Sequence, residues 1–361
     1  MRFLSDQVAA LSQRYEVWVI VNATSRDELP DLPAEVGVLP VRIERRPSPL
    51  NDLIALGKIV RLCRHYRFDL IHSITPKAGL LAMIASFVAR VPIRIHTFAG
   101  EVWATRQGPS RQALKAADKV TASLATCVLV ISRSERDFLL AERIVGGGSR
   151  VLASGSIAGV DTERFRPDPE ARHAVRRELG IDEDDIVFLF VGRLNRDKGV
   201  LLLADAYSRV SLERTDCLLM FVGPDEEGLS RLPALADRPG ILCIGPSTEP
   251  ERYMAAADVF CLPSRREGFG EVLLEAAAAG IPTVASDVYG ISDAVARDST
   301  GLLHQPGDVT DLCRCMSRMA ADADLRARFG ASGRRRVIDK FQRRVLTEAL
   351  LETYRDLLAE R

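Results

Sequence analysis

The sequence predicts an α/β protein of two doubly wound domains that face one cleft, each a parallel β-sheet with helices on both faces. Three observations predict this architecture. The 361 residues suit two domains of roughly 150 to 200 residues each. Short runs rich in Val, Ile and Leu alternate with longer amphipathic segments, and the alternation restarts in the second half. The composition, 47% hydrophobic and 27% charged, is typical of a folded protein with a large core.

The first half is predicted to begin with a helix and to contain four strands. Apolar residues near the start follow helical spacing: Phe3, Leu4, Val8 and Leu11. Four runs are predicted strands: residues 16–22, 69–73, 94–98 and 127–132. The longest apolar stretch, residues 78–89, has 12 residues, well short of the roughly 20 that span a bilayer, so we predict a buried helix there.

A polar segment, residues 159–170, is the predicted domain boundary, because its two prolines cannot continue a helix or a central strand. The alternation then restarts with five predicted strands: residues 186–192, 217–223, 240–245, 258–264 and 281–287. The last segment is amphipathic with helical spacing. We therefore predict a first domain over 1–165, a second over 166–340, and a helix over 341–361 that packs across their junction.

The charge of the chain is divided between its halves. The net charge is zero, yet residues 1–167 carry 23 Lys and Arg against 16 Asp and Glu, so the first half is basic and the second acidic. One helix-like stretch concentrates basic side chains: Lys58, Arg61, Arg64, His65 and Arg67. Such a surface can face anionic lipid or an anionic acceptor, and an ordinary solvated helix face stays open as the alternative.

Neither the cysteines nor the first residues indicate a metal site or export. The seven cysteines are an odd number, and the closest pair, Cys313 and Cys315, has a spacing that suits neither a zinc site nor a redox motif. The first ten residues have no apolar centre of the kind that signal peptides carry. We expect no metal or other cofactor, no nucleic-acid partner, and a location in the cytoplasm.

The strongest functional motif is EGFGEVLLE at residues 267–275, between a predicted strand and an Ala-rich helix. Free backbone N–H groups at the helix start, with the positive end of its dipole, can hold a diphosphate. Gly268 and Gly270 let the backbone approach such a ligand closely. Glu271 and Glu275 lie four apart on one helical face, where like charges repel, so helix stability does not explain them. The predicted ligand is a nucleotide diphosphate.

The parts of this motif have separate predicted partners. Glu275 is suited to accept a hydrogen bond from a ribose hydroxyl. Glu267 can accept hydrogen bonds from the hydroxyls of a transferred sugar, while the backbone amides of Phe269 and Gly270 support the same ring. The alternative is that both carboxylates are merely solvated at the surface.

A second motif is VGRLNRDKG at residues 191–199, where a buried strand ends at Gly192 and a helix starts near Gly199. Arg193 and Lys198 are then placed at the carboxyl edge of a parallel sheet, the usual place for ligand binding. Two cations there can neutralise the charge that builds on a departing diphosphate.

Together the two motifs resemble the family-four glycosyltransferases, retaining enzymes of the two-domain GT-B fold, and the resemblance covers nearly the whole chain. Their second domains carry Gly-Arg-Leu-x-x-x-Lys-Gly and a Glu, seven residues, Glu element. The resemblance implies metal-independent transfer from a nucleoside diphosphate sugar, with Arg193 and Lys198 on the phosphates, Glu267 on the sugar and Glu275 on the ribose. The implied catalytic residues are Glu267, Arg193 and Lys198. The implied donor site comprises Gly192, Arg193, Lys198, Glu267, Gly268, Phe269, Gly270, Glu271 and Glu275.

Two stretches of the first half, residues 72–85 and 96–108, resemble the branch that builds bacterial capsule and O-antigen polysaccharides. That branch often transfers from uridine diphosphate sugars to polyprenyl-linked or glycan acceptors, which implies a peripheral protein at the inner face of the membrane. Many relatives read Thr-x-His-Gly where this chain has TFAG at residues 97–100, so a histidine often placed near the donor sugar is absent. We expect a structural or hydrogen-bonding role for His72 and His96.

The resemblance also bears on the beginning of the chain, because relatives have a strand and a loop before the first helix. In a doubly wound order of 3-2-1-4-5-6, that strand lies in the middle of the sheet. We therefore expect that the first strand of the N-terminal domain is missing. Either Met1 is an internal methionine of a longer chain, or the sheet closes without its usual centre.

Three other functions stay open. An oxidoreductase would carry G-x-G-x-x-G after a strand, whereas GGG at residues 146–148 follows a predicted helix. A nucleotide-sugar epimerase would change the donor without any acceptor. A non-catalytic or truncated relative would bind the donor and transfer nothing. Incubating donors with and without acceptors separates these classes from a transferase.

Overall fold

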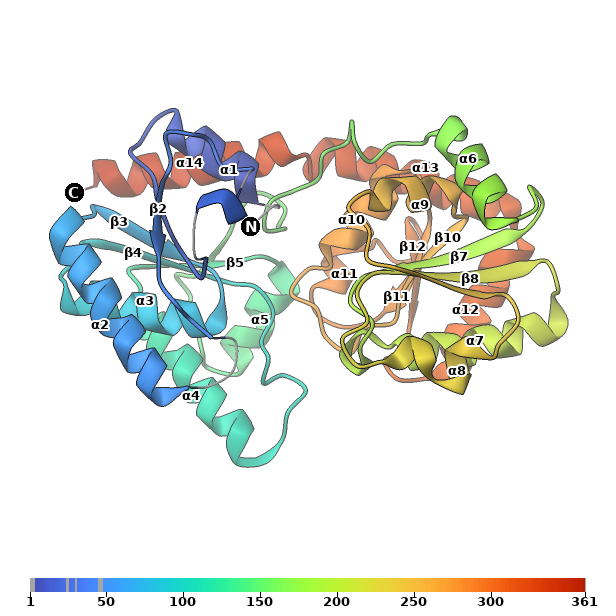
Figure 1. The fold of residues 1–361 in the computed structure, drawn as a ribbon, viewed down its shortest axis with the longest axis horizontal. Helices are drawn as coiled ribbons and strands as arrows, with labels where there is room; N and C mark the ends of the chain where they lie inside the picture. The colour runs from blue at the N-terminus through green and yellow to red at the C-terminus, as the bar shows by residue number, and fades with distance from the viewer. Residues whose placement is uncertain (1–3, 24–25, 30, 45–47, 361) are drawn as a thin grey trace. The chain divides into compact units, whose positions relative to one another are not determined.

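The computed structural model describes residues 4–23, 26–29, 31–44 and 48–360, which form two compact units (Figure 1). Unit 1 comprises Met1–Ala158 with Arg343–Arg361, and unit 2 comprises Gly159–Gln342. Both are α/β with parallel strands, which confirms the predicted fold class. The units divide after Ala158 rather than after residue 165, and the last helix belongs to unit 1. Its packing across the junction stays a prediction.

Unit 1 begins with a helix, as predicted, although Phe3 lies outside the described residues. Its helical segments are α1 (Ser5–Ser12), η2 (Arg26–Glu28), α2 (Pro49–Tyr66), α3 (Pro76–Val88), α4 (Gly108–Leu124), α5 (Arg133–Ala141) and α14 (Arg343–Ala359). Its strands are β1 (Trp18–Val21), β2 (Gly37–Pro40), β3 (Leu70–Ser73), β4 (Ile93–Phe98), β5 (Cys127–Val130) and β6 (Arg150–Val151).

The strands of unit 1 form two sheets instead of one. β1 pairs with β2 in a two-stranded sheet, and the other four form a sheet of order β3-β4-β5-β6. Every pairing is parallel. The strands of unit 1 therefore do not close into one sheet, since among the described strands none joins β1 to β3.

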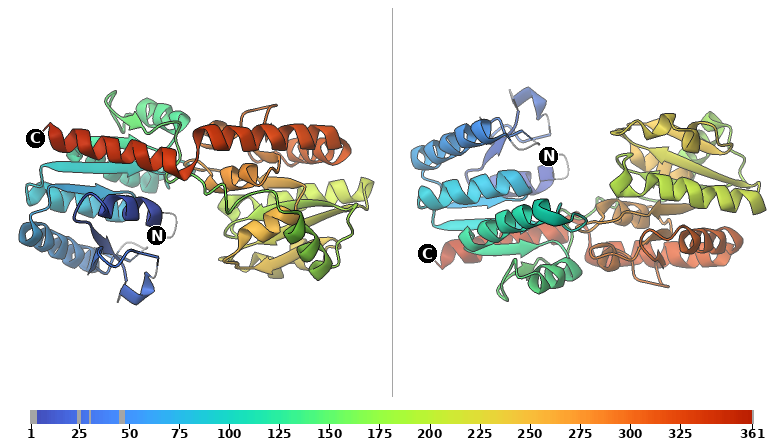
Figure 2. Two further views of the ribbon diagram at one scale, coloured as in Figure 1. Left: turned by 90° about the horizontal axis from the view of Figure 1, so that it is seen from above. Right: turned by 90° about the horizontal axis from the view of Figure 1, so that it is seen from below.

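Helices cover both faces of the four-stranded sheet (Figure 2). On one face, α2 and α3 pack against Ile71 of β3. On the opposite face, Leu350 and Tyr354 of α14 and Leu11 of α1 pack against Ile95 of β4. The predicted buried helix is α3, in which Met83 and Ala85 are fully buried. No helix within the described part of the chain is long and apolar enough to cross a membrane.

Unit 2 is a single six-stranded parallel sheet of order β12-β11-β10-β7-β8-β9. Its strands are β7 (Ile186–Val191), β8 (Cys217–Val222), β9 (Ile241–Gly245), β10 (Val259–Leu262), β11 (Thr283–Ser286) and β12 (Gly301–His304). Its longer helices are α6 (Pro169–Leu179), α7 (Val200–Glu213), α9 (Pro250–Ala256), α10 (Glu271–Ala278), α12 (Val309–Ala321) and α13 (Ala323–Lys340). Its short helical segments are η3 (Arg196–Lys198), η4 (Leu229–Arg231), α8 (Pro233–Ala236) and α11 (Ile291–Ala294).

The strand order of unit 2 reverses between β7 and β10, which are hydrogen-bonded neighbours. β7 is followed along the chain by β8 on one side of the sheet, whereas β10 is followed by β11 on the other. Ligands of doubly wound sheets bind at the carboxyl ends of the two strands that flank such a reversal. The motifs at 191–199 and 267–275 follow these two strands.

Candidate functional site

The loop after β7 is shaped by a close approach of two glycines. Gly192 has a φ of 155° and donates its N–H to the carbonyl of Val222 at 2.9 Å. Gly223, with a φ of 144°, leaves no room for a side chain, since a Cβ there would overlap the carbonyl oxygen of Gly192. The backbone of Leu194 then donates to Pro224 at 2.8 Å. The loops after β7 and β8 therefore support each other, and Arg193 lies between these anchored positions.

Arg193 is held in place by a carboxylate from the neighbouring loop. Its Nη1 lies 3.1 and 3.0 Å from the two carboxylate oxygens of Glu226. Asn195 fixes the same carboxylate, because its Nδ2 donates to Glu226 Oε2 at 2.9 Å. The Asn195 Oδ1 accepts from the backbone N–H of Lys198 at 3.0 Å and so caps η3. The Arg193 side chain remains 42% exposed, so a ligand can reach it.

Lys198 and Glu267 meet across the two motif loops. The Lys198 ammonium forms an ion pair with Glu267 Oε1, although the residues are far apart in sequence. The same oxygen accepts a hydrogen bond from the fully buried Ser264 hydroxyl at 2.9 Å. Both charged side chains are mostly buried. The structure therefore brings together two of the three residues expected to be catalytic, and a buried hydroxyl orients one of them.

A second glycine draws the motif loops together. Gly199, at the start of α7, has a φ of 74°, and a Cβ there would overlap the carbonyl oxygen of Pro263 in the loop after β10. Nearby, the backbone of Arg265 donates to the carbonyl of Asp197 at 2.9 Å. Arg266 pairs with the Asp197 carboxylate at 3.2 Å. The distance between Lys198 and Glu267 therefore depends on Gly199 having no side chain.

We expect Gly199→Ala to destabilise the protein more than a matched change elsewhere. Gly228 is the control, since its φ of 69° is also left-handed but no atom lies within 4 Å of a Cβ placed there. Both changes carry the left-handed penalty of about 1 to 2 kcal/mol. Gly199→Ala should cost about 2 kcal/mol more, because the two loops must separate. Urea unfolding measures the free energy of unfolding of both variants. Equal losses would show that the close approach of Gly199 to the Pro263 carbonyl does not affect stability.

Two glycines with left-handed backbone angles, Gly270 and Gly290, shape the loop from 267 to 270 that leads into α10. Gly270 has a φ of 82° and is the N-terminal cap of α10. Gly290, in the loop after β11, lies so close that a Cβ would overlap the carbonyl oxygen of Gly268. The Phe269 side chain points away from solvent, 1% exposed, with its ring 5.5 Å from that of Phe341. Only the Phe269 backbone is therefore left to contact a donor, as its predicted role requires.

The two carboxylates of α10 are both partly exposed. Glu271 lies in the first turn, where the positive end of the helix dipole favours a negative charge. Glu275 lies one turn further, close enough to Arg164 for its charge to help raise the pKa of that guanidinium. The larger cause of this raised pKa is the hydrogen bond from Arg164 to Glu251. Glu275 is thus a partly buried carboxylate beside an arginine.

Three contacts of this site could not be predicted from the motifs alone. Ser264 orients Glu267, while Asn195 and Glu226 fix Arg193. Asn195 had a recognisable local signal, since an Asn three residues before the end of a short helical turn is a common cap. Ser264 stands three residues before Glu267, in the loop after the buried strand β10. Glu226 had no signal, because its contact depends on the pairing of β7 with β8.

Unit 1 places its two candidate histidines in buried hydrogen bonds. The ring nitrogens of His72 lie 2.8 Å from Tyr354 Oη and 2.7 Å from Thr97 Oγ1. His96 Nδ1 lies 2.8 Å from Ser73 Oγ. Burial lowers the pKa of His72 to about 4 and that of His96 to about 3, so both rings are neutral at pH 7. These contacts agree with the hydrogen-bonding role expected for both.

The loop that follows β4 carries the departure from the family pattern and rests on buried polar contacts. Trp103 is 1% exposed and donates its indole N–H to Asp118 at 2.6 Å. Burial and the adjacent Glu101 carboxylate raise the pKa of Glu135 well above its usual range. Ala99 has no group that could replace the missing imidazole.

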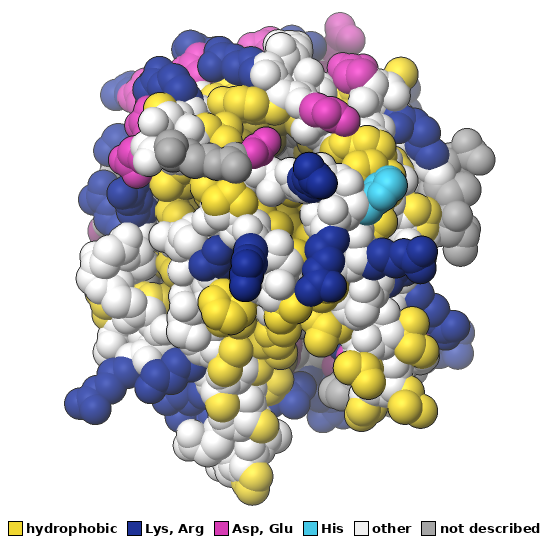
Figure 3. Space-filling model, turned by 90° about the vertical axis from the view of Figure 1, so that its left-hand side faces the viewer, with side chains coloured by type: hydrophobic (Ala, Val, Ile, Leu, Met, Phe, Trp, Pro, Cys, Tyr) yellow, Lys and Arg dark blue, Asp and Glu magenta, His cyan; other side chains and the backbone are white. Residues whose placement is uncertain are grey.

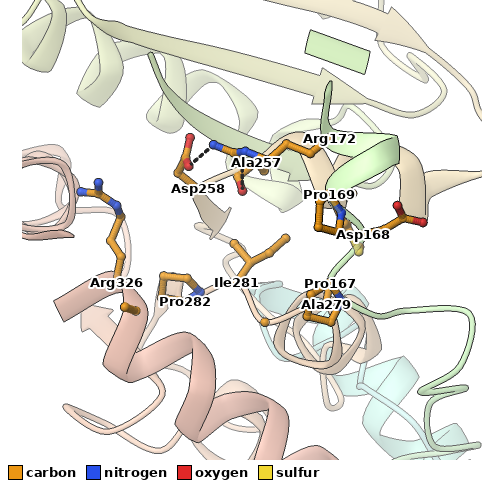
Figure 4. A pocket seen from close by; sticks show the side chains of 14 residues that line it. Pro167, Asp168, Pro169, Arg172, Ala257, Asp258, Ala279, Ile281, Pro282 and Arg326 are labelled. Atoms are coloured by element: carbon orange, nitrogen blue, oxygen red, sulfur yellow. Dashed lines mark hydrogen bonds and ion pairs between the residues drawn. The ribbon is translucent and has the colours of Figure 1, made fainter. Parts of the chain in front are cut away.

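A cavity of about 270 Å³ lies at the other edge of the unit 2 sheet, near the amino ends of β10 and β11 (Figure 4). Its cations already have partners. Arg172 contacts Asp258 at 2.9 Å, and Arg326 donates to the carbonyls of Met319 and Ala320. The cavity has none of the motif residues, so the candidate donor site is at the opposite, carboxyl edge.

Family comparisons agree with this geometry. Residues 171–336 match the glycosyl transferases group 1 family, and residues 2–152 match the glycosyl transferase 4-like domain. The capsular polysaccharide biosynthesis glycosyltransferase CapM of Staphylococcus aureus is 29% identical over 89% of this chain and 85% of its own length. The alpha-maltose-1-phosphate synthase of Mycolicibacterium smegmatis is 32% identical over 80% of this chain and 79% of its own.

A further relative and a solved structure extend these similarities. The UDP-Gal:alpha-D-GlcNAc-diphosphoundecaprenol alpha-1,3-galactosyltransferase of Escherichia coli is 24% identical over 88% of this chain and 83% of its own length. The structure of Anabaena HepE in complex with UDP-glucose has a TM-score of 0.81 and 20% identity, covering 98% of this chain and 95% of HepE. The chain therefore belongs to the group 1 glycosyltransferases, the family-four enzymes of GT-B fold that its motifs resemble.

Proposed function

We propose that this glycosyltransferase moves a sugar from a UDP-sugar onto a polyprenyl-linked or glycan acceptor, with retention of configuration, during assembly of a surface polysaccharide. The observation that carries the proposal is the Lys198–Glu267 pair, which joins the two motif loops at the strand reversal of unit 2. The E. coli relative is named for a UDP-galactose donor and a diphosphoundecaprenol acceptor. HepE supports the same donor class at the level of fold alone.

The proposed chemistry is electrostatic. As the bond between sugar and diphosphate breaks, negative charge builds on the departing phosphate oxygens. Arg193 exchanges Glu226 for a phosphate, which its planar guanidinium can contact with two N–H groups. Lys198 lies beside Glu267. The Lys198 ammonium can therefore contact the phosphate while the Glu267 carboxylate accepts hydrogen bonds from the hydroxyls of the sugar. The backbone N–H groups at the start of α10 supply the remaining positive potential. No metal ion is required in this scheme.

A ligand screen followed by product analysis tests the proposal. UDP should raise the melting temperature of the protein more than ADP or GDP does, because a ligand at about 100 times its Kd adds about 2.7 kcal/mol. The UDP-sugar that stabilises most should then be transferred in the presence of EDTA, with retained anomeric configuration by NMR. An inverted product would contradict retention, and transfer abolished by EDTA would contradict metal independence.

A division of roles between the two carboxylates is a second test. If Glu275 binds the ribose, Glu275→Ala should weaken the binding of UDP about tenfold or more. This is the loss expected when a hydrogen bond to a charged group is removed. Glu267→Ala should weaken the binding of the intact UDP-sugar to a similar extent and leave the affinity for UDP almost unchanged. The control is Glu178→Ala, at an exposed carboxylate on α6. Calorimetry measures the affinity of each variant for UDP and for the UDP-sugar. If each variant loses the same affinity for both ligands, the proposed division of roles is wrong.

A non-catalytic sugar-nucleotide binder is the second candidate function. Two observations favour it: Ala99 stands where many relatives have a histidine, and the sheet of unit 1 is divided. Such a protein would respond to UDP in the thermal screen but would neither transfer nor hydrolyse any donor. Assays with donor alone and with acceptors therefore separate it from the transferase.

We further propose that the protein works as a peripheral protein on the inner face of the cell membrane. A polyprenyl-linked acceptor is anchored in that membrane, so the enzyme must reach the lipid surface to meet it. The basic first half supports this location, because the cytoplasmic leaflet carries anionic lipid.

A further inference from the structure

The exposed face of α2 has an unusual composition. Its inner face packs on the core through Ala55, Ile59 and Cys63, each 2% exposed. The outer face is formed by residues at the helical spacing of i, i+3, i+4 and i+7, which places their side chains together on the side of the helix opposite the core. The exposed members of this outer face are Leu50, Leu53, Ile54, Gly57, Lys58, Arg61, Arg64 and His65. We call this set the α2 outer face.

The first half of the α2 outer face is apolar. Leu50, Leu53 and Ile54 are 78%, 66% and 68% exposed. A single exposed leucine is ordinary on a protein surface, but three on adjacent helical positions form a patch. α2 makes its core contacts through the opposite side, so burial in the fold of unit 1 does not explain these three side chains.

The second half of the α2 outer face is basic. Arg61 and Arg64 are exposed there, on the same side of the helix as the apolar patch, while the Lys58 ammonium donates to the carbonyl of Pro40 at 2.7 Å. Two carboxylates near the start of α2 are already paired with cations: Asp52 with Lys77 at 2.5 Å, and Glu44 with Arg42 at 2.8 Å. The helix therefore presents positive charge beside exposed hydrocarbon. Figure 3 shows the same combination on one face of unit 1, where Lys and Arg side chains lie beside hydrophobic ones.

We infer that the α2 outer face docks on an anionic lipid bilayer. Leu50 and Arg64 are 14 positions apart, which corresponds to about 21 Å along a helix, so a helix lying flat would place both halves on the bilayer together. The three apolar side chains would enter the boundary between headgroups and acyl chains. The long side chains of Arg61 and Arg64 would reach the lipid phosphates. This inference rests on the proposed function, for which it locates the membrane-facing surface.

Vesicle binding measured without any donor or acceptor tests the apolar half. The protein should sediment with vesicles of 70% phosphatidylcholine and 30% phosphatidylglycerol. The double variant Leu53→Ser with Ile54→Ser should bind about tenfold more weakly, since burial of two such side chains contributes at least about 1.4 kcal/mol. The control is Leu212→Ser, which removes another exposed leucine, 87% accessible, on α7 of unit 2. Binding that is equal in the double variant and the control would overturn the inference.

Charge reversal tests the basic half. The double variant Arg61→Glu with Arg64→Glu should lose about tenfold or more in affinity for the same vesicles, because each basic residue near an anionic surface contributes about 1 kcal/mol. The loss should shrink as salt rises. The control is Arg335→Glu, at an exposed arginine on α13. Binding that ignores charge reversal, salt and phosphatidylglycerol would overturn the inference.

Two further measurements separate this inference from its rivals. If the apolar patch instead binds a second copy of the chain, sedimentation velocity will show a dimer that the Leu53→Ser, Ile54→Ser variant lacks, with vesicle binding unchanged. That result would overturn the inference. Thermal unfolding with and without UDP shows whether each variant is folded and has a working donor site. A variant that keeps its UDP response but leaves the vesicles supports docking through α2, whether or not transfer is later observed.

Discussion

Replacing Arg193 by alanine is expected to lower turnover by about a hundredfold or more while the protein stays folded. Mutations that remove one group stabilising developing negative charge typically cost this much. Arg193 is the cleanest test because its partner Glu226 is retained by Asn195 and lies near solvent. Lys198→Ala would be harder to interpret, since it also removes the ion pair that holds Glu267. Steady-state kinetics with the donor found in the thermal screen measures the effect.

The control for this prediction is Arg196→Ala. Arg196 belongs to the same loop and is also paired, with Glu227 at 3.5 Å, but its side chain is 72% exposed. Its loss should change turnover by less than about threefold. If Arg193 acts only on the departing diphosphate, kcat and kcat/KM should fall together. A fall in affinity alone, with kcat unchanged, would assign Arg193 to ground-state binding and contradict its catalytic role.

Much of unit 2 could be predicted because its evidence is local. Central parallel strands are buried on both faces, so they appear in the sequence as continuous apolar runs, and β7, β8, β10 and β11 were each expected. β12, whose sequence is GLLH, was not predicted as a strand. The same holds for β2, with four residues, and β6, with two. Pairing partners stabilise these strands more than their own sequences do.

The limits of the unit 1 prediction have a different physical cause. The boundary was expected at 165 because prolines mark it, yet Val160 and Phe165 are buried within unit 2. A polar sequence that contains two prolines shows where regular structure stops, but the contacts of distant segments decide which unit a residue joins. The backbone of Val160 donates to Phe341, 181 positions later in the chain. Such a contact leaves no local pattern.

The candidate site likewise has features that the local sequence predicts and contacts that depend on the fold. Glycines with special backbone angles, the capping asparagine and the helix start all lie within short motifs, so the type of ligand could be inferred from them. The contact between Lys198 and Glu267 depends on β7 and β10 being neighbours, which follows from the doubly wound order. The pairing of Arg193 with Glu226 depends on a loop geometry that no spacing predicts. Ion pairs between loops are therefore the part of the site that only the structure provides.

The largest effect on stability is expected at Arg176, on α6 of unit 2. Its side chain is completely buried, and its guanidinium donates to four backbone carbonyls and one carboxylate. The carbonyls belong to Ala256 and to the loop that precedes β7, and the carboxylate is Asp258, before β10. Asp258 also accepts from the backbone of Val187 in β7. One side chain thus ties α6 to the starts of the two strands that carry the candidate site.

We expect Arg176→Ala to lower the free energy of unfolding by about 3 to 5 kcal/mol, because it leaves buried acceptors without a donor. A loss of this size is a large part of the roughly 5 to 15 kcal/mol that stabilises a domain, and should lower the melting temperature by about 10 °C. Arg176→Lys should recover little, since a single ammonium cannot reach carbonyls on two sides as the planar fork does. The control is Arg177→Ala, the exposed neighbour on the same helix, which should change stability by less than about 0.5 kcal/mol. Chemical denaturation of the three variants decides, and a lysine variant as stable as the natural protein would mean that the charge alone, rather than the fork of hydrogen bonds, holds α6 to the sheet.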